Sequence, residues 1–339
     1  MGRDPRLRGR LARKGKISAN RFIHAKPQGR DAQRHGTHRL DSDAAHDAVG
    51  KRSFRRYSLV EGTLREHASS GNAYSQSRIY EIAEWIVRGG WPGALDLSAS
   101  DAVHVPREYI AQLEENDIHR IDNIRRNVHK IDLLLRSLAR NESTTASIGK
   151  LCADISGTDR ETVDPDTVSA YLNALQRLFV IEDQRPFHAN ARSSVRVKQS
   201  EKRHFCDPSL ACAVLRLTPE RLVGDLNFMG FLFEELVERD LRVYAASFGA
   251  QLMHYQDYSN RELDAVIEME NGDWAAVEIK LGAAQEDAAA ANLLAIRDAI
   301  AKEPKGRPQK SLIVVLGCSA AAYTRPDGVH AVPVSAFRP

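Results

Sequence analysis

The sequence predicts an α+β protein in which a helical N-terminal part precedes a mixed, α/β-like sheet flanked by helices. Two observations carry this prediction. Apolar residues recur at helical spacing before residue 216, and after it short apolar segments typical of strands alternate with helical ones. The first 72 of the 339 residues fit neither pattern. We therefore expect a disordered basic arm (1–72), a helical segment (73–140), a segment of helices and a hairpin (141–215) and a sheet domain (216–339).

Charge is unevenly distributed along the chain. The arm carries 17 Lys and Arg against 7 Asp and Glu, and the rest carries 31 against 38, so the total of +3 describes neither part. The net charge is therefore weak evidence for nucleic-acid binding. The chain has no run of about 18 apolar residues and no secretory signal pattern, which predicts a cytoplasmic protein without a membrane span. Its four cysteines lack C-x-x-C spacing and are expected to be reduced core residues.

The first ordered helix is expected to begin near Tyr74. Its apolar face contains Ile82 and Ile86, and it stops at Gly89-Gly90-Trp91-Pro92. Further helices follow to about residue 140, with apolar residues spaced three and four apart.

Residues 141–215 have the order of a winged helix. A helix-turn-helix pattern over 143–183 ends in a helix that starts after Asp164-Pro165, and a two-stranded wing follows over 184–205. One interpretation is phosphate contact by the basic wing, and the other is a module that only packs or binds a partner protein. The predicted nucleic-acid-binding residues are Arg192, Arg196, Lys198, Lys202 and Arg203.

The sheet domain begins with a helix over 230–241. Three strands are predicted next, then a helix over 284–302 and two further strands; the strands cover 251–258, 262–268, 274–281, 311–317 and 329–334. The fourth strand is wholly apolar, as expected of a strand buried on both faces.

A pattern of charged residues lies in the second and third strands. Thirteen residues separate Asp264 from Glu278-Ile279-Lys280. A carboxylate on one strand and E-x-K on the next is the signature of the PD-(D/E)XK nuclease-like fold, in which two carboxylates hold Mg²⁺ and the lysine stabilises negative charge. An ordinary hairpin with a solvated polar face explains the same pattern, and both interpretations stay open.

The register of this hairpin decides whether the charged residues meet. A three-residue loop, Glu270-Asn271-Gly272 with Gly272 in the left-handed conformation, places residue 264 opposite 278 and residue 262 opposite 280. The same register gathers one apolar face, composed of Leu263, Ala265, Ile267, Ala275, Val277 and Ile279. We therefore predict that Asp264 and Glu278 lie on one face beside Lys280.

Several motifs from about residue 74 to the C-terminus belong together. They include Gly89-Gly90-Trp91-Pro92, Lys202-x-x-Phe205-x-Asp207, Gly230-x-Leu232-Phe233-Glu234, Glu262-x-Asp264 and Glu278-x-Lys280. This set resembles the domain of unknown function 4143, the C-terminal half of many bacterial and archaeal AAA-type ATPases. The resemblance implies a winged-helix-like segment joined to a PD-(D/E)XK nuclease-like domain, with Glu234, Asp264, Glu278 and Lys280 as its set of acidic residues and lysine.

The chain departs from that family at its N-terminal end. Such proteins normally begin with an ATPase domain, whereas no G-x-x-x-x-G-K-[ST] motif occurs here. We therefore expect no ATP binding, as though the chain had lost its first domain.

Two functions follow from these observations. The first is a non-catalytic or weakly active remnant that binds DNA or a protein partner. The second is a Mg²⁺-dependent DNA phosphodiesterase, in which Asp264 and Glu278 hold the metal, Lys280 stabilises charge and Glu234 orients the attacking water.

Overall fold

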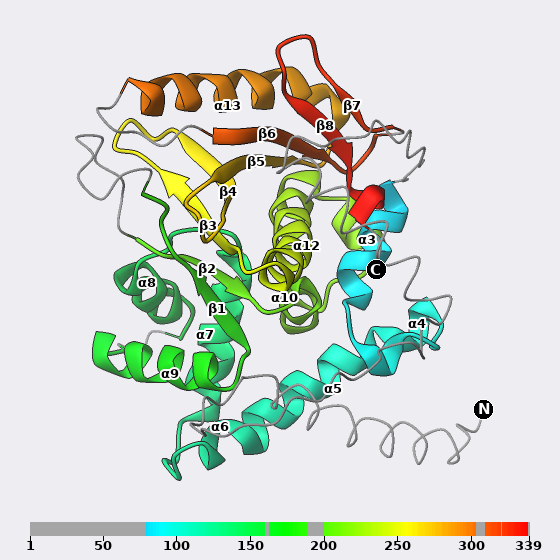
Figure 1. Cartoon of the computed structure of the whole chain (residues 1–339). Helices are drawn as coiled ribbons and strands as arrows, with labels where there is room; N and C mark the ends of the chain where they lie inside the picture. Colours follow the sequence, from blue (N-terminus) through cyan, green and yellow to red (C-terminus); the bar gives the residue numbers. More distant parts are fainter. Residues whose placement is uncertain (1–78, 160–162, 189–199, 303–308, 320, 338–339) are drawn as a thin grey trace, which may run out of the picture.

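The structure, a computed structural model, describes residues 79–159, 163–188, 200–302, 309–319 and 321–337. The predicted basic arm lies outside these residues. The described part confirms a mixed α+β protein, with helices gathered in its first half and a six-stranded sheet in its second (Figure 1).

Helices form the first part of the described chain. The first helix ends at Arg88, immediately before Gly89, which has a φ of 70°. Asn127 and Asp164 cap later helices with their side chains, and Pro165 occupies a first-turn position where no backbone donor is needed. The helices are α3 (Ile79–Arg88), α4 (Ala99–Ala102), α5 (His104–Gln112), α6 (Ile118–Arg120), α7 (Val128–Arg140), α8 (Ile148–Asp159) and α9 (Pro165–Arg177).

A short antiparallel ladder follows α9. It pairs β1 (Ile181–Gln184) with β2 (Lys202–Phe205), so both strands lie close to the predicted wing, while residues 189–199 between them lie outside the described part. The chain beyond β1 then runs beside the large sheet, where Phe187 donates its N–H to the carbonyl of His254 at 2.6 Å. This contact joins the ladder to the edge of the sheet.

Three helices connect the ladder to the sheet. They are α10 (Pro208–Leu215), α11 (Pro219–Val223) and α12 (Leu226–Ser247), each capped at its start by an Asp or Thr side chain. The helix α12 contains the predicted helix over 230–241 and extends beyond it at both ends.

The large sheet has the strand order β3-β4-β5-β6-β8-β7. The strands β3, β4 and β5 form an antiparallel meander, β6 is parallel to both β5 and β8, and β7 is antiparallel to β8. Their bounds are β3 (Gln251–Gln256), β4 (Glu262–Glu268), β5 (Trp274–Lys280), β6 (Gln309–Leu316), β7 (Tyr323–Thr324) and β8 (His330–Pro333). The predicted strands are all present, and β7 is an addition that the sequence pattern did not indicate.

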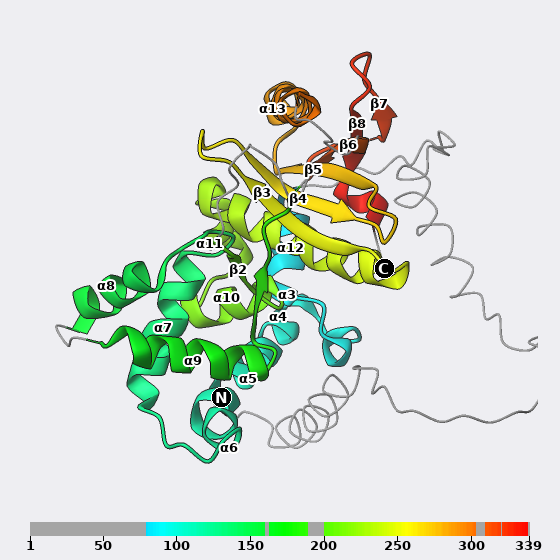
Figure 2. The same ribbon diagram turned by 60° about the vertical axis from the view of Figure 1, so that its left-hand side comes forward.

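Helices cover both faces of the sheet. Figures 1 and 2 show α12 on one face and α13 (Glu286–Ala301), the crossover between the parallel strands β5 and β6, on the other. Apolar side chains alternate between the two faces. Those toward α12 include Ala265, Ile267, Ala275, Val277 and Ile279. Those toward α13 include Val266, Trp274, Ala276, Leu312 and Val314. The central strands are therefore buried on both sides, as predicted for β6.

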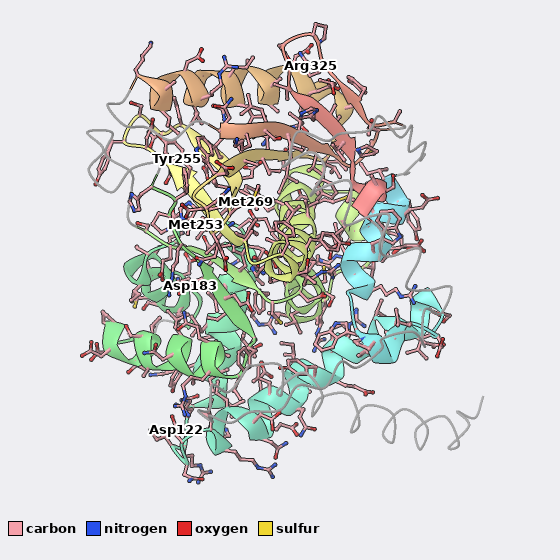
Figure 3. All side chains as sticks on the ribbon, viewed as in Figure 1. Asp122, Asp183, Met253, Tyr255, Met269 and Arg325 are labelled. Carbon is pink, nitrogen blue, oxygen red and sulfur yellow. The ribbon has the colours of Figure 1, made fainter. Side chains whose placement is uncertain are left out.

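The predicted hairpin loop is confirmed. Glu268 pairs with Trp274, Met269 donates its N–H to the carbonyl of Asp273 at 2.8 Å, and Gly272 has a φ of 83°. Met269 is labelled at this end of the hairpin in Figure 3. Ala265 pairs with Val277, which is the offset that the three-residue loop requires.

The predicted pairing does not continue past Ala265. Met253 of β3 pairs with Val266 of β4, and Tyr255 pairs with Leu263. One residue of β3 therefore lies opposite two residues of β4, so β4 contains an extra residue and bulges. The prediction that Leu263 shares a face with Ala265 is therefore wrong, because the bulge turns Leu263 into the cluster beside α13. The ladder likewise ends before residue 262 can pair with residue 280.

Two further expectations concern the membrane and the thiols. Within the described residues, no helix combines the length and apolar character needed to cross a bilayer. The four cysteines are free thiols, as predicted, with Cys212 buried.

Candidate active site

The structure brings Asp264, Glu278 and Lys280 together. The Lys280 Nζ lies 2.9 Å from Asp264 Oδ2 and 2.7 Å from Glu278 Oε2. The two carboxylate oxygens are therefore no further apart than the sum of these distances. The Lys280 side chain is 26 % exposed, whereas the side chains of Asp264 and Glu278 are 11 % and 4 % exposed. The group thus reaches solvent mainly through its lysine.

The bulge in β4 explains how Asp264 enters this group. Where the β4–β5 ladder ends, Asp264 Oδ2 accepts the backbone N–H of Ile279 at 2.7 Å. The carboxylate replaces a backbone carbonyl at that position, so a donor of a buried strand stays satisfied. No hydrogen bond from a described residue reaches the other oxygen, Oδ1.

Asn292 on α13 holds Glu278 in place. Its Nδ2 donates to Glu278 Oε1 at 2.7 Å and to the backbone carbonyl of Glu262 at 2.7 Å. Sequence reasoning missed this residue. The available signal was its position, because Asn292 lies one helical turn from both Ala289 and Ile296 and is a polar residue on the apolar stripe that faces the sheet.

The electrostatics of the group reflect two buried carboxylates that share one ammonium. Burial, and then the charge of Asp264, raise the pKa of Glu278 to about 8. Burial alone would lower the pKa of Lys280, but the two carboxylates outweigh it and raise that pKa. The arrangement favours an additional positive charge beside Asp264 and Glu278.

Glu234 faces a different lysine. Its Oε1 contacts the Nζ of Lys202, which also lies 3.2 Å from Glu238 Oε1. Burial raises the pKa of Glu234 well above its usual value, and the charge of Asp264 adds to this rise, so Glu234 lies within electrostatic range of the first group. Glu234 thus borders the site, with its carboxylate bound to Lys202.

The predicted nucleic-acid-binding residues do not form one surface among the described residues. Lys202 is 1 % exposed and paired with two glutamates, so it is a buried structural cation instead of a phosphate ligand. Arg203 Nε donates to Asp183 Oδ1 at 3.0 Å across the ladder, and Figure 3 labels that aspartate. Arg192, Arg196 and Lys198 lie outside the described residues.

A second buried cluster lies next to Lys202, on the other side of Glu238, which contacts both Lys202 and His204. It contains Glu142, which follows α7, His204 on β2 and Glu235 on α12, and their ligand-type atoms all lie within 4.8 Å of one another. His204 Nδ1 is 2.6 Å from Glu235 Oε2 and 3.3 Å from Glu142 Oε1. Burial alone would lower the pKa of His204, but the charges of Glu238 and Glu235 raise it well above its usual value. This Glu–His–Glu group could hold a metal ion.

The sequence analysis did not identify this cluster. One signal was local, because Lys202 and His204 are two apart on a strand and therefore share a face. The other was on α12, where Glu235 and Glu238 interrupt an otherwise apolar buried stripe. Neither signal indicates that Glu142, far away in the sequence, completes the group.

Two family models match the chain. Residues 79–221 match a domain of unknown function (DUF8612), and residues 229–337 match another domain of unknown function (DUF4143). The predicted resemblance to the second family is therefore confirmed for the sheet domain, whereas the helical part before it is similar to a different family. No curated protein and no solved structure matches the chain.

Proposed function

We propose that the chain is a divalent-metal-dependent phosphodiesterase that acts on DNA, with Asp264, Glu278 and Lys280 as its site. The observation that carries this proposal is the convergence of both carboxylates on one half-buried lysine at the point where β4 and β5 separate. Hard carboxylate oxygens beside a lysine are the groups that phosphodiester hydrolysis requires. The sheet domain with α12 and α13 on its two faces supports the PD-(D/E)XK nuclease-like assignment.

The residues present fit a divalent cation such as Mg²⁺. Two buried carboxylates share a single ammonium, and Asp264 Oδ1 receives no hydrogen bond from a described residue. Asp264 and Glu278 would hold the ion, which when bound would supply positive charge against a phosphate and lower the pKa of a water.

The surrounding residues position this group. Asn292 orients Glu278, and the N–H of Ile279 orients Asp264. Lys280 carries a positive charge at the half-exposed edge of the site, where it would stabilise negative charge on a phosphate oxygen. Glu234 is held by Lys202 at the border of the site, so its predicted role in orienting water requires that this contact weaken.

The test incubates plasmid and linear DNA with the full chain and Mg²⁺ or Mn²⁺. Cleavage by the wild type should fall at least about a hundredfold in Asp264→Asn, because one metal ligand loses its charge. Lys310→Ala is the matched control, since Lys310 pairs with Asp273 at the loop end of the hairpin and should cleave as the wild type does. Equal cleavage by the wild type and Asp264→Asn would contradict the proposal.

A non-catalytic module that binds DNA or a protein, left from an AAA-type ATPase family protein, is the second candidate. The observation in its favour is that Lys280 already bridges both carboxylates and offsets part of their charge without a metal. DNA retention in a gel-shift experiment without cleavage, equal in the wild type and Asp264→Asn, would favour this function.

A further inference from the structure

We infer that Glu142, His204 and Glu235 form a structural site for Zn²⁺ or a similar divalent transition-metal ion. The three side chains are 1 %, 0 % and 0 % exposed. One nitrogen and two carboxylate oxygens are the donors that Zn²⁺ accepts, whereas Mg²⁺ prefers oxygen alone. This site is separate from the Asp264 group and does not depend on phosphodiesterase activity.

The hydrogen bonds of the His204 ring leave Nδ1 for a cation. The other nitrogen, Nε2, shares a hydrogen bond of 3.2 Å with Gln184 Oε1 and lies 3.0 Å from Glu238 Oε2. The amide of Gln184 is oriented by donation from its Nε2 to the carbonyl of Met253. We therefore assign a proton to Nε2 of His204. In the neutral ring, the Nδ1 lone pair then faces two carboxylates and needs a positive charge between them.

Glu235 provides an independent indication of a missing partner. Its Oε1 is buried without a hydrogen bond, and its Oε2 contacts only Nδ1 of His204, at 2.6 Å. Among the described residues, the ion pairs of Glu235 and Glu142 involve His204 alone. Leaving a carboxylate buried without hydrogen bonds is costly, and a bound cation removes that cost. Two carboxylates beside a neutral imidazole match the charge of a divalent ion.

The environment of the site resembles that of a structural metal ion. Glu142 is fixed by the backbone N–H of Phe205, which lies 3.2 Å from its Oε2. Glu238, beside the ring nitrogen Nε2, is in turn held by Lys202. Such outer partners orient metal-ligating histidines, and the burial of all three ligands leaves a bound ion a structural role.

The position of the site in the chain gives the ion a role. Glu142 and His204 belong to the segment that matches one family model, and Glu235 belongs to the segment that matches the other. An ion at this position would tie the end of α7, β2 and α12 together. The ion would thus fasten the helical part to the sheet domain.

The experiment measures the zinc content and thermal stability of the full chain. Wild type purified without added chelator should contain about one zinc per chain and lose thermal stability on treatment with EDTA. Added Zn²⁺ should restore the stability, and added Mg²⁺ should not. A Co²⁺-substituted sample should show a visible spectrum without a thiolate charge-transfer band, because no cysteine is a ligand.

Variants identify the ligands. Glu235→Gln should bind less than about a tenth of the wild-type zinc, and its thermal stability should no longer respond to EDTA. His254→Gln is the matched control, because His254 is also a buried histidine but donates to the carbonyl of Ser200 and has no carboxylate partner in the described residues. This control and Asp264→Asn should both retain zinc.

Two outcomes would overturn the inference. Wild type without zinc, whose stability is the same with EDTA and with added Zn²⁺, would mean that a proton occupies Nδ1 of His204. Zinc retained by Glu235→Gln but released by thiol alkylation would mean that cysteines bind it. If Glu235→Gln does not fold, the wild-type measurements decide.

Discussion

Two charged clusters of this protein are built from the same residue types but differ in their access to solvent. In the first, Lys280 joins Asp264 and Glu278, and the lysine side chain is 26 % exposed. In the second, the Lys202 group, Lys202 joins Glu234 and Glu238 and lies next to the Glu142–His204–Glu235 cluster. Its lysine side chain is 1 % exposed. The first group is therefore open to solvent through its lysine, whereas the lysine of the second group is closed off from it. The same chemistry therefore suits the proposed catalytic site at one place and structural cohesion at the other.

Removal of each lysine should reveal this difference most strongly. Lys202→Met should lower the free energy of unfolding by about 3–5 kcal/mol, because it leaves two buried glutamates without their cation. Lys280→Met should lower it by less, because Lys280 itself is 26 % exposed and water replaces part of its charge beside Asp264 and Glu278. Urea unfolding measures both values. Equal losses in the two variants would break the comparison.

The pH dependence of stability should report the charge of the buried cluster through His254. Burial, and then the charge of Lys202, lower the pKa of His254 from 6.5 to about 4, with Glu238 opposing and the His204 ring adding to the shift. The unfolded chain takes up a proton near pH 6.5, but the folded chain does so only near pH 4. The contribution of His254 is therefore complete above pH 6.5 and declines as the pH falls toward 4.

This decline is measured against His254→Gln, which has no proton to take up. The free energy of unfolding of the wild type should lose about 3 kcal/mol relative to the variant between pH 6.5 and pH 4. Urea unfolding at several pH values provides both curves. Parallel curves would show that Lys202 and the burial of His254 do not oppose protonation.

Asn292 should affect only the cluster that is open to solvent. Asn292→Ala removes the hydrogen bond that orients Glu278, so Mn²⁺ affinity at the Asp264 group should weaken about 10–100-fold. Zinc content should not change. Isothermal titration measures the first and elemental analysis the second, with the exposed Asn173→Ala as control. Unchanged Mn²⁺ affinity would remove Asn292 from the site.

The smallest expected effect concerns the turn that sets the register of the first cluster. Gly272 has a φ of 83°, so Gly272→Ala should lower the free energy of unfolding by about 1 kcal/mol. Gly230→Ala is the opposite case, because an added Cβ on this residue of α12 meets no atom within 4 Å. That variant should be as stable as the wild type or more stable. Thermal unfolding compares the two, and equal shifts would contradict the left-handed turn.

The sequence allowed much of the first cluster to be predicted because its geometry is local. Residues two apart on a strand share a face, and a three-residue loop sets which residues of the two strands face one another. These rules place Glu278 and Lys280 on one face and predict Asp264 beside them, although the bulge in β4 is what brings Asp264 Oδ2 to the N–H of Ile279. They did not reveal the bulge in β4, which turns Leu263 into the cluster beside α13.

The Lys202 group could not be predicted in the same way. The sequence analysis placed Lys202 in a basic wing. Its partners lie 32 and 36 residues further along the chain, so no local pattern indicated that they meet it. Whether a lysine binds phosphate or stabilises a core depends on burial and on which charges surround it.

The sequence by itself determined the order of the elements, the turn at Gly272 and the shared face of Glu278 and Lys280. These features follow from periodicity and turn chemistry within a few residues. Only the tertiary structure decided that Lys202 is buried, that Asn292 holds Glu278 and that Glu142, His204 and Glu235 meet. Such contacts join residues from distant segments, and their partners exist only once the helices have packed on the sheet.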